Sequence, residues 1–357
     1  MNASYLVKKV RSKVIYGAIV ALASYLTLSY SFNTPLSLNK TISIAEPKVN
    51  LEKLIEAANA EGKLIWYESS LAQQAEKIAA AFNKRYPEIK VEHVRLRGSD
   101  VGVRVLAESQ AGATTADVAV SGLDTLMALN KRGVLERVKW TEELGVFSGL
   151  VEVPYAVAST CATYVLVYNT ELISEADAPK NWEDVLNPKF KGKIGIWQRL
   201  TAFANLVPAW GEEKSMAYAK KIKEQNPKFY QSTFPLNAAV SAGEVSLGIS
   251  IYHTAVPSLK KGAPIKIVFT NPTTITILQS GIPKKAAHPN AAKLFVAWLS
   301  SLEGALAYES ATNRGNALLP GTKTFEMLKG VNLSYFPGEQ APELAVWLKK
   351  VEEVIHR

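Results

Sequence analysis

The sequence predicts an α/β protein built from two domains, and three observations lead to this prediction. Apolar runs with the lengths of strands alternate with amphipathic segments along most of the chain. The 357 residues exceed what one hydrophobic core usually serves, since most domains have about 100–200 residues. The chain contains no internal repeat and no low-complexity linker. We therefore expect the two domains to be joined by strands that cross between them rather than by a flexible tether.

In the first half of the chain, strand and helix patterns follow one another in a regular rhythm. The expected strands are residues 63–68, 90–96 and 116–120, and the expected helices are residues 51–60, 72–86 and 103–111. Gly62 ends the first helix. Pro87 ends the second, because a proline disfavours the helical conformation in the residue before it. This rhythm favours a mostly parallel sheet with helices on both faces.

The second half continues the pattern with longer apolar segments. Further strands are expected at residues 163–169, 194–197, 245–252, 266–269 and 275–282, and further helices at residues 289–309, 323–329 and 341–356. The run 163–169 (TYVLVYN) is almost wholly apolar, so we expect it to cross between the domains. Residues 181–196 read NWEDVLNPKFKGKIGI, which predicts a short helix begun by Asn181, a turn and a buried strand.

The first 45 residues predict export. Residues 1–13 hold four basic side chains and no acid, and residues 14–32 are almost uncharged, which is typical of an export signal. The apolar run approaches the ~20 residues that span a bilayer. We expect either a signal peptide cleaved after Ala45 or an uncleaved N-terminal membrane anchor. Both place the rest of the chain in the periplasm or on the extracytoplasmic cell surface.

Composition narrows the choice of partners. The single cysteine, Cys161, allows no internal disulfide, and its neighbours predict that it is buried. The formal net charge is +9, but five of the basic residues lie in residues 1–45. The remaining positive excess forms no basic stripe with interleaved aromatic residues, so we expect no nucleic-acid partner. A modest positive balance is compatible with an anionic ligand.

Four segments of the chain resemble one family. Residues 181–196 are similar to a segment with the family pattern tWeDLldPkwKGKi, residues 289–309 to PnAAklFidfLlSpeGQ, residues 116–135 to ADVff…l..L.kaGlLe and residues 239–249 to aV..GEv.lgi. These patterns are those of extracytoplasmic solute-binding proteins of ABC importers, in the ferric-iron-binding class. The matching segments occur in the expected order and extend over most of the chain.

The resemblance implies a type 2 periplasmic-binding-protein fold, in which two α/β lobes joined by crossing hinge strands enclose a ligand cleft. Lobe 1 would comprise residues 46–155 completed by 271–311, and lobe 2 residues 156–270 completed by 312–357. Such a cleft closes on its ligand by hinge motion, and the closed form docks on a membrane permease. We therefore expect a monomeric receptor that captures a small-molecule solute and delivers it to an ABC permease.

Candidate ligand groups follow the strands, because ligands of open α/β sheets bind at the carboxyl ends of the strands. These residues carry hydroxyl, amide, guanidinium or aromatic groups: Ser69, Ser70, Arg97, Ser99, Ser121, Gln198, Arg199, Thr201, Thr233, Tyr252 and His253. Arginines pair with carboxylates and phosphates. We therefore expect a small anionic organic or phosphorus-containing solute. A serine at such a turn also serves as a helix N-cap, and an arginine also lies exposed to solvent, so structural roles stay open for these residues.

The resemblance also implies an alternative ligand, ferric iron (Fe³⁺) carried as cargo. Iron-binding members of the family use two adjacent tyrosines and often a histidine after the first strand. Here Tyr252-His253 stands at the tyrosine pair, and the turn 68–71 has no histidine. Tyr252 and His253 are therefore the metal-binding alternative, helped by Glu68 or an exogenous anion. In the preferred interpretation, Tyr252 instead stacks on or hydrogen-bonds an organic ligand.

Catalytic motifs are absent from the sequence. G-x-S-x-G, H-E-x-x-H and C-x-x-C do not occur, and the four histidines lie far apart along the chain. We therefore expect neither an enzyme nor a resident metal or cofactor. An enzyme on the same fold stays a second alternative, because one fold hosts many functions.

Overall fold

The computed structural model describes residues 51–113 and 116–356. The expected export segment, residues 1–45, lies outside the described residues. Among the helices of the described residues, none combines the length and the apolar character needed to cross a membrane.

Ten strands of the described residues form one sheet, whose main path runs β2-β1-β3-β9-β4-β7-β5-β6, with β10 beside β9 and β8 beside β4. The strands are β1 (Lys63–Glu68), β2 (Lys90–Arg95), β3 (Val118–Gly122), β4 (Val157–Asn169), β5 (Ile194–Trp197), β6 (Lys228–Tyr230), β7 (Leu247–Ile251), β8 (Ile265–Val268), β9 (Thr273–Gly281) and β10 (Leu333–Ser334). β1 pairs in parallel with β2 and β3, as the alternating pattern predicts.

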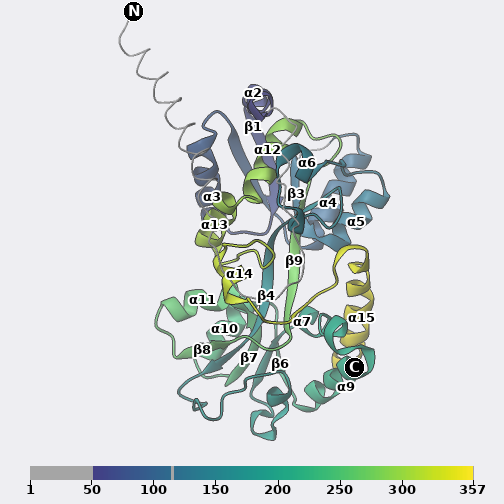
Figure 1. Cartoon of the computed structure of the whole chain (residues 1–357). Coiled ribbons are helices and arrows are strands. Elements are labelled where there is room, and N and C mark those ends of the chain that lie inside the picture. The colour runs from purple at the N-terminus through teal and green to yellow at the C-terminus, as the bar shows by residue number, and fades with distance from the viewer. Residues whose placement is uncertain (1–50, 114–115, 357) are drawn as a thin grey trace, which may run out of the picture. The chain divides into compact units, whose positions relative to one another are not determined.

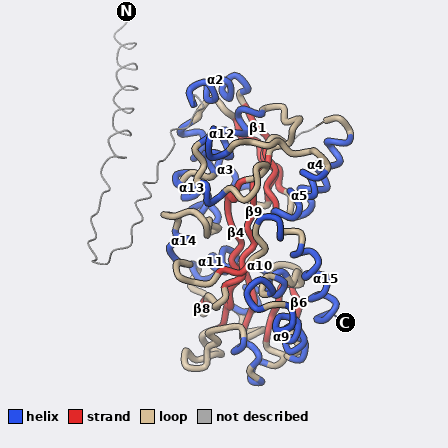
Figure 2. The backbone as a smooth tube through the Cα atoms, turned by 45° about the vertical axis from the view of Figure 1, so that its right-hand side comes forward, coloured by secondary structure: helices blue, strands red, loops and turns tan. Residues whose placement is uncertain are grey.

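Two long strands connect the two lobes. The first half of β4 pairs antiparallel with β9, and its second half pairs with β7 and β8. β9 in turn pairs with β3 and also contacts α7, so each of the two strands contacts elements of both lobes. Figures 1 and 2 show β4 and β9 running through the middle of the molecule, between the elements around β1 and those around β7. Residues 163–169, expected to cross between the domains, form the second half of a longer crossing strand, β4, which begins at Val157.

Helices surround the sheet. They are α2 (Leu51–Glu61), α3 (Ala72–Arg85), α4 (Ser99–Gln110), α5 (Leu123–Lys131), α6 (Trp140–Leu144), α7 (Thr201–Ala204), α8 (Val207–Trp210), α9 (Glu212–Glu224), α10 (Thr233–Ser241), α11 (Tyr252–Lys260), α12 (Pro289–Leu299), α13 (Leu302–Thr312), α14 (Lys323–Met327) and α15 (Glu343–His356). α12 packs on α2, and α13 packs on α3, so segments far apart in the sequence complete the lobe that contains β1. α15 packs on α9 and α7 in the lobe that contains β7.

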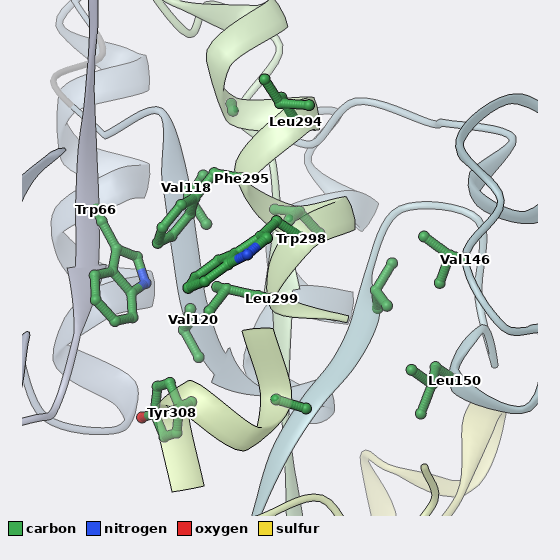
Figure 3. Packing of buried hydrophobic residues seen from close by; sticks show 14 of the residues in the cluster. Trp66, Val118, Val120, Val146, Leu150, Leu294, Phe295, Trp298, Leu299 and Tyr308 are labelled. Atoms are coloured by element: carbon green, nitrogen blue, oxygen red, sulfur yellow. The ribbon is translucent and has the colours of Figure 1, made fainter. Parts of the chain in front are cut away.

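Separate hydrophobic clusters stabilise the two lobes. In the lobe around β1, Trp66, Phe82 and Phe295 are fully buried, and their rings meet edge to face at 5.0–5.2 Å between centroids. Figure 3 shows Trp66 facing the α12 side chains Phe295 and Trp298. The lobe around β7 has its own cluster, which includes Trp182 and Phe203. The expected burial of Cys161 is confirmed.

Three local expectations are wrong in detail. Residues 289–309 form two helices rather than one, because the Ser301 hydroxyl accepts a hydrogen bond from Gly304 N and starts a new helix. A Cβ at position 304 would collide with the backbone of Trp298, so glycine is required at this break. The strand expected to reach residue 252 ends at Ile251, and Tyr252 begins α11.

The segment 181–196 is also built differently from the expectation. Two 3₁₀ turns, η2 (Glu183–Leu186) and η3 (Pro188–Phe190), replace the short α-helix before β5. Asn181 does not cap them; its side-chain oxygen accepts from Asn271 N, and Asp184 instead accepts from Lys180 N and Asn181 N. The expected lobe boundaries stay predictions.

Candidate functional site

The carboxyl end of β1 carries a buried carboxylate. Glu68 is 1% exposed and accepts hydrogen bonds from Ser70 N and from the Tyr308 hydroxyl of α13, the latter at 3.1 Å. His93 Nε2 of β2 lies 3.3 Å from the same carboxylate. Burial works to raise the pKa of Glu68, but His93 and the charge of Arg314 outweigh it and lower that pKa below its ordinary value. Glu68 is therefore ionised, and its hydrogen bonds hold the negative charge in one position next to Arg314.

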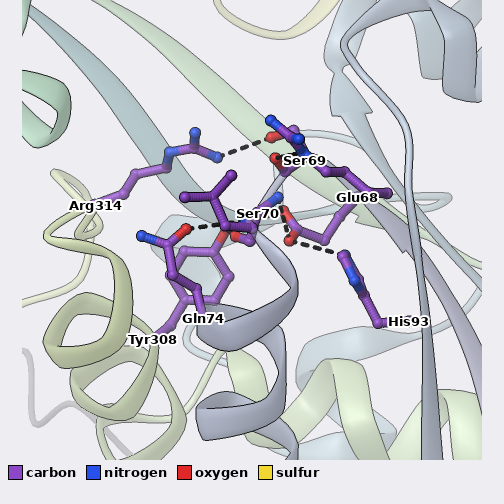
Figure 4. Close-up of polar contacts among 9 residues, drawn as sticks. Glu68, Ser69, Ser70, Gln74, His93, Tyr308 and Arg314 are labelled. Carbon is purple, nitrogen blue, oxygen red and sulfur yellow. Dashed lines mark hydrogen bonds and ion pairs between the residues drawn. The ribbon is translucent and has the colours of Figure 1, made fainter. Parts of the chain in front are cut away.

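Close to Glu68, the Arg314 side chain forms hydrogen bonds to residues of both lobes. Its Nη1 donates to the Ser69 hydroxyl at 3.2 Å, and its Nη2 donates to His253 Nε2 at 3.0 Å. Ser69 follows β1, whereas His253 lies in the first turn of α11 after β7. Figure 4 shows Arg314 reaching toward Ser69 from one side, while His93 reaches toward Glu68 from the other. The guanidinium thus lies between the carboxyl ends of two strands from different lobes.

The turn that carries Arg314 is held by the crossing strand β4. α13 ends at Asn313 in the left-handed conformation, with φ of 57°. Arg314 N donates to the Thr312 hydroxyl at 3.0 Å. The next carbonyl, Gly315 O, accepts from Cys161 N of β4 at 2.8 Å. These bonds fix the backbone of Arg314, and its bonds to Ser69 and His253 hold the guanidinium, so little conformational freedom remains to be lost when it binds a ligand.

Two buried nitrogen atoms beside this bridge have no hydrogen-bond partner among the described residues. They are Arg314 Nε and His253 Nδ1. Because the guanidinium can only donate, His253 Nε2 accepts, and in the neutral ring Nδ1 carries the hydrogen. Burial, with the nearby charge of Arg314, lowers the pKa of His253 well below 6.5, so the ring is neutral at pH 7. Both unpartnered groups are therefore donors, and they suit an acceptor such as an anion.

A second arginine, Arg199, follows β5 and approaches Gly98 of the other lobe. Arg199 is exposed, its guanidinium lies 5.8 Å from the Trp197 ring centroid, and its Nη1 lies 3.2 Å from where a Cβ of Gly98 would stand. Gly98 has φ of 45° at the turn before α4, a conformation that L side chains rarely adopt. Its carbonyl accepts from the Ser121 hydroxyl at 3.0 Å. Arg199, Gly98 and Ser121 thus meet across the two lobes.

The other expected residues have different roles or positions in the structure. Ser70 is buried and shares a hydrogen bond with Tyr308 at 3.1 Å, so it belongs to the support of Glu68. Thr201 and Thr233 begin α7 and α10, and Gln198 and Arg97 are exposed. Tyr252 begins α11, with its ring 5.4 Å from that of Phe269. Ser99 begins α4, and its side chain is outside what the structure describes.

The sequence interpretation missed Arg314, Tyr308 and His93. None of them follows a strand, so the rule about strand ends could not select them. A local signal existed for Arg314, because Asn313-Arg314-Gly315 after a helix is typical of a left-handed helix end. Nothing local indicated that this turn meets Ser69, which is 245 residues away along the chain.

Metal-binding groups do not converge in this region. Across residues 51–113 and 116–356, no group of three or more His, Cys, Asp or Glu side chains is placed to hold a metal ion. His253 has its Nε2 engaged by a cation, Arg314. Burial, with the charge of Glu309, raises the pKa of Tyr252 above 10, which opposes the phenolate form.

Comparisons with known proteins agree with this architecture. A family model described as "Bacterial extracellular solute-binding protein" matches residues 77–324. The chain is 26% identical over 266 residues to the "Major ferric iron-binding protein" of Neisseria gonorrhoeae, covering 70% of this chain and 79% of that protein.

Two solved structures share the fold. Iron-bound HitA from Pseudomonas aeruginosa is similar with a TM-score of 0.69 and 22% identity, covering 82% of this chain and 99% of that one. The periplasmic binding protein AfuA from Actinobacillus pleuropneumoniae, with exogenous fructose-6-phosphate bound, is similar with a TM-score of 0.64 and 22% identity, covering 83% of this chain and 97% of that one.

Proposed function

We propose that this chain, which belongs to the bacterial extracellular solute-binding protein family, captures a small organic or phosphorus-containing anion. The chain is a solute-binding protein of an ABC importer and not an enzyme. Its partners are a small-molecule solute and a membrane permease. In our proposal the anion binds between the lobes, beside Arg314, and its binding closes them.

One observation carries the choice of an anion. Arg314 reaches Ser69 and His253 from opposite sides, and both Arg314 Nε and His253 Nδ1 are buried donors without a partner in the described chain. An unpaired buried donor costs about 1–3 kcal/mol. A carboxylate or phosphate oxygen would satisfy both donors and would meet a guanidinium of fixed geometry.

The surrounding groups fit the same ligand class. Arg199 adds a second guanidinium from the β5 side. The first turns of α10 and α11 direct backbone N–H groups toward the carboxyl ends of their strands, where partial positive charge favours an anion. We propose that the eleven expected residues line the path between these arginines, with Ser70 acting through Glu68.

Ferric iron is the second candidate, favoured by the similarity to a ferric iron-binding protein. For iron to bind at Tyr252 and His253, the Arg314 guanidinium would have to leave His253 Nε2. The raised pKa of Tyr252 also works against the phenolate that Fe³⁺ prefers. These two features place iron behind an anion in our proposal.

The test is a binding comparison with the full chain. Calorimetric titration with fructose 6-phosphate, inorganic phosphate and citrate should give saturable one-to-one binding for at least one of the three. Native mass spectrometry of the purified protein should show a bound organic or phosphorus-containing anion. If ferric chloride with carbonate instead produces a tyrosinate-to-iron band in the visible spectrum, and no anion binds alone, the iron candidate replaces the proposal.

A further inference from the structure

A small cavity of mixed polar and apolar lining lies at the hinge, apart from the Arg314 bridge. It is formed where the turn after β3, the crossing strand β9, the end of α7 and the segment after β10 meet. A space of about 20 Å³ is open to a water-sized sphere, enough for about one water molecule or one ion. Its polar lining includes Asp124, Glu152, Asn205, Gln279 and Tyr335, none of which the sequence interpretation selected.

Two amide oxygens of this lining have no partner among the described residues. They are Asn205 Oδ1 and Gln279 Oε1, and both residues are at most 1% exposed. The amide orientations follow from their nitrogens, since Asn205 Nδ2 donates to Ile275 O at 2.8 Å and Gln279 Nε2 donates to Glu152 Oε2 at 3.2 Å. Turning either amide would place oxygen against oxygen. Each unpartnered oxygen therefore needs a donor or a cation.

The lining also carries negative charge without a countercharge. Glu152 accepts from the Tyr335 hydroxyl at 3.2 Å and from Gly338 N at 3.0 Å, both neutral donors. Asp124 lies in the first turn of α5, and burial raises the pKa of its carboxyl. Neither carboxylate forms an ion pair within the described part of the chain. Both side chains are half-buried, so a countercharge within reach would stabilise them.

We propose that this hinge cavity binds one monovalent cation of the size of K⁺ or ammonium, held by the oxygens of Asn205, Gln279 and Asp124. Oxygen-only ligands suit a hard cation. A water molecule would satisfy the amide oxygens but would leave the carboxylate charge unbalanced. Divalent ions are disfavoured because Glu152 is already engaged by three donors and because no group of three acidic, His or Cys side chains converges in the described chain.

A cation in the hinge cavity would lie between elements of both lobes. Asp124 follows β3, Gln279 lies in β9, and Asn205 follows α7. The Asn205 carbonyl also accepts from Ser334 Oγ of β10 at 2.6 Å. A cation here would link the crossing strand to elements of both lobes, so it should stabilise the folded chain whether or not solute is present.

The first test is thermal unfolding of the full chain at constant ionic strength. Replacing N-methyl-D-glucamine chloride by KCl or NH₄Cl should raise Tm saturably, by about 5 °C at a hundredfold excess over Kd. An equal Tm in all three salts, or a rise produced only by Ca²⁺ or Mg²⁺, would overturn the proposal.

Variants and a heavy monovalent ion locate the site. Asp124→Asn should abolish the salt-specific rise, whereas Asp100→Asn should keep it, because Asp100 occupies the same second position of α4 but is exposed. In wild-type crystals soaked in thallium(I) acetate, we expect one anomalous peak in the cavity, a result that does not depend on whether Asp124→Asn folds. A rise that survives Asp124→Asn, or a cavity without an anomalous peak, contradicts the assignment.

Discussion

The two polar regions between the lobes have opposite chemical character. In the Arg314 bridge beside β1, the unpartnered atoms of the bridging side chains are donors, Arg314 Nε and His253 Nδ1. At the hinge cavity, they are acceptors, Asn205 Oδ1 and Gln279 Oε1. Both regions join elements of both lobes, yet the first suits an anion and the second a cation. The kind of unpartnered buried atom therefore indicates the sign of a ligand more directly than net charge does.

The regions also differ in how their charged groups are balanced. Arg314 has the buried Glu68 as a fixed countercharge, which lowers the pKa of that carboxyl. Asp124 has no such partner in the described chain, and the pKa of its carboxyl is raised by burial. In the Arg314 region, the charges of Arg314 and Glu68 balance each other before a ligand binds. In the hinge cavity, the charge of Asp124 would be balanced only when a cation binds.

The largest effect should come from Arg314→Gln. Removing the guanidinium that bridges Ser69 and His253 should weaken anion binding about 100-fold, equivalent to about 2.7 kcal/mol, in line with a charged hydrogen-bonding pair. Calorimetry with the anion found for the wild type measures this loss. Arg132→Gln is the matched control, since Arg132 is an exposed residue that ends α5 and should not affect binding. Equal affinities of the two variants would show that the Arg314 guanidinium does not bind the anion.

A smaller effect on stability is expected for Glu68→Gln. The amide keeps one oxygen and can accept from only one of the two donors, Ser70 N and the Tyr308 hydroxyl, and it leaves Arg314 without its countercharge. We expect a loss of about 2 kcal/mol in the free energy of unfolding. Denaturant titration measures it against Glu92→Gln, which disrupts only an exposed ion pair with Lys90. A loss no greater than that of Glu92→Gln would mean that Glu68 does not stabilise the bridge.

The pH dependence of stability should report on His253. Because burial and Arg314 lower its folded pKa well below 6.5, the unfolded chain binds the proton first as the pH falls. Stability should therefore be unaffected above about pH 6.5 and should decrease below it, by at most about 1.4 kcal/mol per pH unit. His253→Gln should remove this part of the slope, and His356→Gln, at the exposed end of α15, should retain it. Identical slopes in both variants would contradict a neutral, buried ring.

Much of the fold was predictable because its signals are local. Gly62 and Tyr86, before Pro87, mark the ends of α2 and α3, and the apolar run 163–169 lies in the crossing strand β4. The break at Gly304 was missed because it depends on how closely that residue approaches Trp298. An apolar helical pattern continues through the break and conceals it.

The candidate site was less predictable, because its geometry depends on contacts between residues far apart in the sequence. Ser69 and His253 follow strands, so the general rule about strand ends selected them. Arg314 lies in a turn after a helix, and its importance comes from contacts with residues 61 and 245 positions away. The hinge cavity was missed altogether, because unpartnered amide oxygens are defined by packing and leave no pattern in the sequence.

The smallest effect is expected at the exposed edge of the anion region. Arg199 is exposed and approaches Gly98 of the other lobe, so its charge should attract an anion without being desolvated. Arg199→Ala should therefore weaken binding only about fivefold, as exposed charges contribute up to about 1 kcal/mol, and the difference should shrink at high salt. Calorimetry at two ionic strengths measures both quantities, with Arg132→Ala as control.

Tyr252→Phe sharpens the same contrast, because it removes a half-buried hydroxyl and no charge. Its effect on affinity should be similar in size but independent of salt. If neither Arg199→Ala nor Tyr252→Phe changes affinity at any salt concentration, the anion contacts only the Arg314 bridge. The preference of the Arg314 region for an anion would then come only from its buried donors, as the preference of the hinge cavity for a cation comes from its buried acceptors.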